Sequence, residues 1–282
     1  MSMPPPPMPS SAPVPPPAPY PGPVIGYASG TRAAFESSHV RGRLAIAGLV
    51  AMVVAHVAIV AFNLAQLSHH RAFDDSDGWY DRQHVMDLAA GGIGLVTLGA
   101  FVFTVVTYLM WVHRVHRNLP ALVAGPLRFT PGWAVGYYFI PIINLFRPYQ
   151  AMTEAYNASR AGVDGSAAAT STGWDARPTG TSLIGWWWAT WIVSNVIDRV
   201  AFRMATRAGD DPDQQAAALW AEMTSAAVSI VAAVLLVRLI RRVTELQARS
   251  VSSLQQQYYA AHGQYPQNYA YGYGQPPLPP RG

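Results

Sequence analysis

Residues 88–111 read LAAGGIGLVTLGAFVFTVVTYLMW, a run that contains no charged side chain. An α-helix rises about 1.5 Å per residue, so about 20 apolar residues cross the roughly 30 Å hydrocarbon layer of a bilayer. The run therefore has the length and the composition of a membrane-spanning helix. A buried helix of a soluble protein is the alternative, and such a helix requires a polar shell around it.

The rest of the sequence argues against a soluble protein. Hydrophobic residues make up 51% of the 282 residues and charged residues only 12%, where a soluble domain has about 25% charged residues. Three further apolar runs have similar length. We therefore predict an all-α integral membrane protein with four transmembrane helices, at about residues 44–67, 88–112, 182–202 and 217–240.

A fifth apolar stretch, GWAVGYYFIPIINLF at residues 132–146, is short and is flanked by Pro131 and Pro148. Short segments broken by proline are more often re-entrant or interfacial than spanning. We predict a re-entrant or interfacial segment at 131–147, with a fifth span as the alternative. The following residues 149–160 have the pattern of a short amphipathic helix on the membrane surface.

Both ends of the chain have biased composition. The first 24 residues contain 12 prolines, and the last 30 or so are rich in glutamine, tyrosine and proline. Such segments bury too little apolar surface to offset the entropy lost on ordering. We predict disordered tails at 1–38 and 250–282 around a membrane domain at 39–249.

The positions of the charges indicate an orientation, because arginine and lysine collect on the cytoplasmic side. With four spans, most arginines flank the ends on the same side as both termini, while aspartates dominate the other side. This predicts a plasma-membrane protein with both termini in the cytoplasm. Arg199, Arg203 and Arg207 oppose this orientation.

Residues 111–199 carry three distinctive strings: WVHRVHRNL at 111–119, FTPGWAVGYYFIPIINLFRPYQAMTE at 129–154 and GWWWATWIVSN at 185–195. This arrangement resembles the actinobacterial membrane family named domain of unknown function 4328, over roughly residues 41–247. The resemblance implies a four-helix membrane domain and no established activity.

Candidate structural or ligand-contacting residues lie in these strings. They are Trp111, Arg114, Arg117, Asn118, Pro131, Gly132, Trp133, Pro141, Asn144, Pro148, Tyr149, Glu154, Trp187, Trp191 and Asn195. Trp111, Arg114 and Asn118 share one helical face. They form either a clamp for phosphate or a lipid headgroup, or an ordinary interfacial arginine collar. Glu154 is an alternative partner for one of these arginines.

The other candidates also have two interpretations. Pro141 and Asn144 either expose backbone groups to a substrate or dock the broken segment onto the bundle. Trp187 and Trp191 belong either to an aromatic belt or to a cation-binding cage, and Asn195 on the same face would bond a neighbouring helix. His56 lies within the first apolar run, as a proton relay or as a neutral histidine bonded to a neighbouring helix.

Enzyme signatures are absent from the sequence, and without cysteine or lysine it has no thiol nucleophile or Schiff-base lysine. We expect no catalytic residue, cofactor, metal site or nucleic-acid partner; the acidic loop at 69–84 does not fit a calcium-loop template. The leading hypothesis is a non-enzymatic membrane protein that presents cytoplasmic Pro-rich tails to protein partners. The alternative is a small-molecule or lipid-handling core such as a transporter subunit. The bilayer and a homo-oligomer are the other partners considered.

Overall fold

The computed structural model describes residues 35–71, 77–123, 126–164, 182–209 and 211–262. Most of both predicted tails and part of the acidic loop lie outside the described residues. Within these ranges all regular structure is helical, which confirms the all-α prediction. The elements are α1 (His39–Arg71), α2 (Asp77–Leu122), α3 (Pro131–Gly136), the 3-10 turns η1 (Tyr137–Phe139) and η2 (Ile143–Leu145), α4 (Arg147–Asp164), α5 (Ser182–Ala208) and α6 (Pro212–His262).

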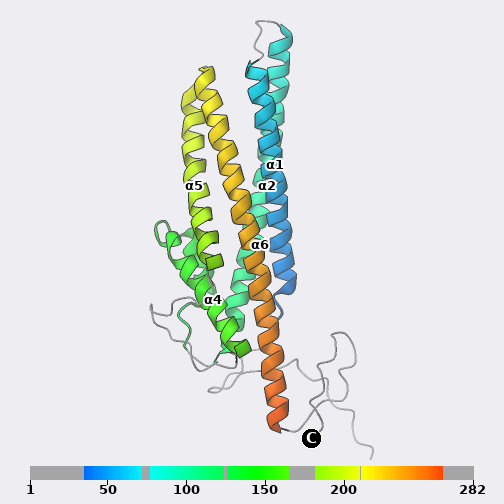
Figure 1. Cartoon of the computed structure of the whole chain (residues 1–282), viewed down its shortest axis with the longest axis vertical. Helices are drawn as coiled ribbons and strands as arrows, with labels where there is room; N and C mark the ends of the chain where they lie inside the picture. Colours follow the sequence, from blue (N-terminus) through cyan, green and yellow to red (C-terminus); the bar gives the residue numbers. More distant parts are fainter. Residues whose placement is uncertain (1–34, 72–76, 124–125, 165–181, 210, 263–282) are drawn as a thin grey trace, which may run out of the picture.

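The long helices form two hairpins, α1 with α2 and α5 with α6, joined along α1 and α6 (Figure 1). Both hairpins turn at the upper end of the bundle in this view. The beginning of α1 and the end of α6 point toward the opposite, lower end, where α4 packs on α6 and α2. The two ends of the described chain therefore leave the bundle in the same direction.

Three helices, α1, α2 and α6, contain segments long and apolar enough to cross a membrane. Most of those apolar segments are not buried inside the protein. Large side chains such as Leu95, Val96 and Phe101 on α2 are more than half exposed, as expected for a surface that faces lipid. These helices imply a bilayer environment. The 27-residue α5 does not meet the same criteria, and its role as a fourth span stays a prediction.

Two predicted boundaries need correction. The predicted C-terminal tail begins at residue 250, whereas α6 continues to His262, and Ser250 and Ser253 are bonded to α4. The N-terminal tail was placed up to residue 38, but Ser38 is buried and Glu36 is bonded to α2. In both places polar contacts add to apolar packing, since Phe35 and Val251 also lie against the hydrophobic core.

The segment at 131–147 is divided into α3, η1 and η2 and is not one continuous helix. Thr130 caps α3 by accepting a hydrogen bond from the Trp133 amide, and Pro131 occupies its first turn, where a missing N–H costs nothing. Ile142 has φ of 69°, a left-handed conformation that β-branched residues avoid. A six-residue helix rises only about 9 Å, so the alternative of a fifth helical span is not supported.

The glycines of α1 and α2 differ in how closely other residues approach them. A Cβ atom on Gly48 of α1 would lie 2.7 Å from Oγ1 and 2.9 Å from Cα of Thr104, so this glycine permits the close approach of α1 and α2. Gly91, Gly92, Gly94 and Gly99 of α2 lie in more open surroundings. None of these four has a neighbour within 4 Å of a built Cβ among the described residues.

Candidate functional site

A buried polar network joins α2 to α6 at the lower end of the bundle. Trp111 Nε1 donates to Thr244 Oγ1 over 3.1 Å, and Asn118 Nδ2 donates to Gln247 Oε1 over 3.2 Å. Gln247 Nε2 in turn donates to the Val115 carbonyl over 3.0 Å. Trp111, Asn118 and Gln247 are fully buried. Polar groups at such depth need partners, and the two helices supply them to each other.

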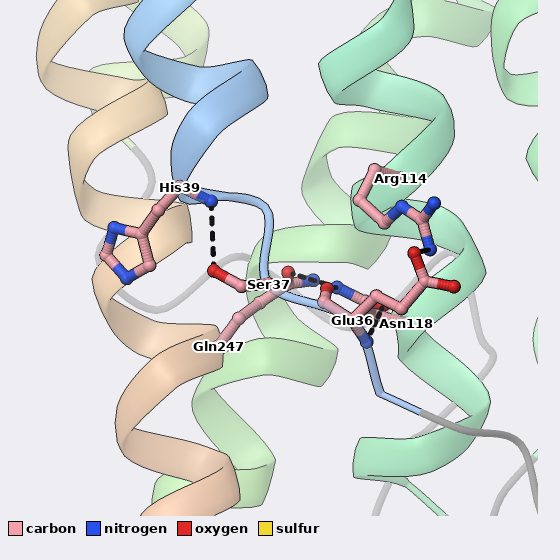
Figure 2. A network of polar contacts seen from close by, with 6 residues as sticks. All are labelled: Glu36, Ser37, His39, Arg114, Asn118 and Gln247. Carbon is pink, nitrogen blue, oxygen red and sulfur yellow. Dashed lines mark hydrogen bonds and ion pairs between the residues drawn. The ribbon is translucent and has the colours of Figure 1, made fainter. Parts of the chain in front are cut away.

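The segment before α1 completes this network (Figure 2). Asn118 binds the Glu36 backbone on both sides: Asn118 Oδ1 accepts from the Glu36 amide and Nδ2 donates to its carbonyl over 2.8 Å. The hydroxyl of Ser38 donates to Gln247 Oε1 over 3.3 Å. The chain that precedes α1 is therefore attached to α2 and α6 through its backbone and one hydroxyl.

The carboxylate of Glu36 forms an ion pair with the guanidinium group of Arg114 (Figure 2). The Arg114 side chain is only 8% exposed, whereas the Glu36 side chain is 54% exposed. The hydrogen bond to Arg114 lowers the pKa of Glu36, and the charges of Arg114, Arg117 and Arg41 lower it further. Glu36 is consequently ionised at neutral pH.

These contacts show what Trp111, Arg114 and Asn118 of α2 bond in the structure. Arg114 and Asn118 both bond the segment before α1, and Trp111 is buried in the core, where it stacks on Tyr108 at 5.9 Å. The Trp111 side chain therefore packs inside the protein, and the Asn118 amide is bonded to Glu36 and Gln247. Arg117, one turn further along α2, is exposed.

Glu154 of α4 holds the loop before α3. Its two carboxylate oxygens accept hydrogen bonds from the backbone amides of Arg128 and Phe129, over 2.6 and 3.1 Å. Partial burial raises the pKa of Glu154, which the two amides oppose. An arginine side chain of α2 is one alternative partner that the sequence suggests for Glu154; the donors in the structure are backbone amides of the loop.

The broken segment is bonded to α2 and α5 through polar groups. Trp188 Nε1 donates to the Leu145 carbonyl over 2.9 Å, and Asn144 Nδ2 donates to the Tyr138 carbonyl over 3.4 Å. The hydroxyls of Tyr138 and Tyr108 lie 2.8 Å apart. These bonds satisfy backbone groups that a substrate site would leave free, so they favour the docking interpretation of Asn144.

The remaining proline and aromatic candidates are spread along this segment and the start of α4. Pro141 and Gly132 are exposed, Pro148 is buried in the first turn of α4, and Tyr149 is half-buried. Trp133 is exposed and stacks on Tyr137 at 5.3 Å. They do not converge on a common point with Arg114.

The tryptophans of α5 pack against the protein in two different ways. Trp187 is buried and contacts Tyr108 edge to face, while Trp188 stacks on Trp191 at 4.6 Å. Asn195 was expected to bond a neighbouring helix, but its amide donates to the Trp191 carbonyl of its own helix. His56 likewise bonds the Met52 carbonyl of α1. Asn195 and His56 thus each bond the carbonyl four residues earlier in their own helix.

Sequence reasoning missed Glu36, Ser38, Thr244 and Gln247. Glu36 and Ser38 lie beside a proline-rich stretch and were assigned to the tail. Thr244 and Gln247 follow the last apolar run, but their signal was present: Ile240, Val243, Gln247 and Ser250 repeat at helical spacing and are all buried. Extending that pattern beyond the apolar run would have placed Gln247 on the inner face of α6.

Helix content, apolar spans and an internal polar network define the chain as an all-helical protein with membrane-type helices. The model of the family described as "Domain of unknown function (DUF4328)" matches residues 74–245, and the chain belongs to this family. The match starts later than the predicted residue 41, so α1 and Glu36 precede it. No curated protein and no solved structure matches the chain. An actinobacterial source stays a prediction.

Proposed function

We propose that the protein is a non-enzymatic, multi-pass plasma-membrane protein that presents two Pro-rich tails to cytoplasmic protein partners. The observation that carries the proposal is the position of the two tail-bearing ends. The segment before α1 is bonded to α2 and α6 through Asn118 and Gln247, and α6 runs on toward the same side. A bundle so arranged holds both low-complexity segments on one face of a membrane.

Sequence composition supports a binding role for these segments. Proline runs at 4–7 and 15–17, and prolines at 276, 277, 279 and 280, favour the extended polyproline II conformation. Such segments lose little entropy when they dock into aromatic grooves of partner domains. The proposal is non-enzymatic because the sequence contains no catalytic signature, and Asn118 and Glu154 are bonded to backbone groups of neighbouring segments.

The proposed topology has four spans, with α5 as the fourth and both termini in the cytoplasm. The packing of α5 along α6 supports the fourth span. A helix that lies alongside a membrane-spanning helix over its length occupies the same depth of the bilayer. Arg41, Arg43, Arg114 and Arg117 near the lower end fit the cytoplasmic side. The segment at 131–147 would then lie at that interface, held by Trp188.

Single cysteines test this topology, since the chain has no cysteine of its own. We expect D75C and D211C to react with an impermeant maleimide in intact cells, and G165C to react only after the membrane is permeabilised. The unsubstituted chain is the control for background labelling. Labelling of G165C in intact cells would contradict the four-span arrangement.

The tail function is tested by cross-linked affinity purification from native membranes. The unaltered chain is compared with a variant in which prolines 4–7, 15–17, 276, 277, 279 and 280 are replaced by alanine, which keeps the length and charge of both tails. We expect partners on the unaltered chain and loss of most of them from the variant. A partner set that does not change with these substitutions would overturn the proposal, and lipids or small molecules retained instead would favour the transporter-subunit alternative.

A further inference from the structure

Among the described residues, the charges found to act on Glu36 are all basic. Arg114, Arg117 and Arg41 all act electrostatically on the single Glu36 carboxylate. The charges of the same three arginines also act on His113, the residue before Arg114. Arg41 lies in the first turn of α1 and Arg114 and Arg117 lie near the end of α2, so three positive charges act on one carboxylate, of which Arg114 is paired with it directly.

The central arginine of this group is incompletely satisfied. Arg114 is 7% exposed, and its Nε is buried without a hydrogen-bond partner among the residues that the structure describes. A guanidinium group has five N–H donors, and the one carboxylate of Glu36 cannot use them all. An unpartnered donor on a buried cation indicates a site suited to an anion with more acceptor oxygens.

The carboxylate can leave without unfolding the segment that carries it. The Glu36 backbone is held separately, by the side-chain amide of Asn118 on both its N–H and its C=O. The Glu36 side chain itself is 54% exposed. A rotation about its side-chain bonds would thus open the arginine group to an outside anion, while Asn118 and Gln247 keep the chain in place (Figure 2).

We propose that Arg114, Arg117 and Arg41 form a binding site for a phosphate group, and that the Glu36 carboxylate occupies this site as an internal competitor. Arginine suits phosphate because its planar fork pairs with two oxygens at once. The site lies just beyond the apolar run that ends at Trp111 and just before the one that begins at Leu44, which is the headgroup level of a spanning protein. The phosphate of an anionic lipid is therefore the source that the position favours, and free phosphate is the other.

Native mass spectrometry of the full-length chain tests the site, with phosphatidylglycerol added to detergent micelles as the probe. We expect R117Q and R41Q each to weaken lipid retention by about tenfold, the loss of a charge-assisted hydrogen bond. E36Q should strengthen retention, because it removes the competing charge while the Asn118 bonds remain. R43Q is the matched control: Arg43 is exposed in the same turn of α1, but it is not among the charges that act on Glu36, and retention should not change.

Lipid retention is expected to fall in R117Q and R41Q and to rise in E36Q. A purely structural role of these residues would not change retention in opposite directions. Equal retention in all variants, equal losses in R117Q and R43Q, or weaker retention in E36Q would each overturn the proposal. Inorganic phosphate added as a competitor distinguishes the sources: displacement of the lipid at low phosphate concentration would show a site for free phosphate. The inference is independent of the proposed tail function, since lipid retention is measured without any protein partner.

Discussion

Replacing Trp111 by alanine should destabilise the protein by about 3–5 kcal/mol, the range for removing a large aromatic side chain from a packed core. The Trp111 side chain is 0% exposed, stacks on Tyr108 and donates to Thr244. Its loss leaves a cavity between α2 and α6 and an unpaired hydroxyl. Unfolding in mixed micelles of mild detergent and dodecyl sulfate, followed by circular dichroism, measures the difference.

Trp186 provides the matched control, because it is the same residue type but 66% exposed on α5. W186A should change the unfolding midpoint little. W111F should fall between the two, since it keeps most of the ring and loses the hydrogen bond. Equal midpoints for W111A and W186A would show that the packing of α2 against α6 described here is not what stabilises the bundle.

Replacing Gly48 by leucine should separate α1 from α2 and cost about 1–3 kcal/mol or more, as overpacking does. A Cβ there would meet the Thr104 backbone at 2.9 Å, and backbone cannot move aside as a flexible side chain would. The same micelle unfolding experiment measures the loss.

Gly94 on α2 is the control for that substitution, because nothing among the described residues lies within 4 Å of its built Cβ. G94L should leave the midpoint of the monomer unchanged. If G94L were as destabilising as G48L, α2 would have to contact something outside this chain at that point. A second copy is the first such neighbour to examine, by cross-linking.

Local sequence patterns predicted much of the helical framework, because hydropathy over about 20 residues depends on composition alone. The face shared by Trp111 and Asn118 also follows from helical spacing, and the structure buries both. The partners of that face could not be found in the same way. Gln247 is 129 residues away from Asn118, and no local pattern indicates which helices pair.

Glu36 shows a second limit of sequence reasoning. It lies next to a proline-rich stretch with no apolar periodicity, which is the signature of a disordered tail. Two hydrogen bonds to Asn118 and an ion pair to Arg114 nevertheless fix it. Order that depends on specific polar contacts leaves no trace in hydropathy, so the end of a predicted tail is where such contacts are most easily missed.

The length of α6 has a consequence for where the two ends of the chain are released. With 51 residues at about 1.5 Å each, α6 is about 75 Å long, more than twice the roughly 30 Å hydrocarbon thickness. α1 begins at His39, close to the first apolar run, whereas α6 continues from the end of its run near Ile240 to His262. The start of α1 therefore lies close to the end of an apolar run, whereas the end of α6 lies about 30 Å beyond its own run along the helix axis. The start of α1 and the end of α6 are therefore at different distances from a bilayer that the apolar runs would span.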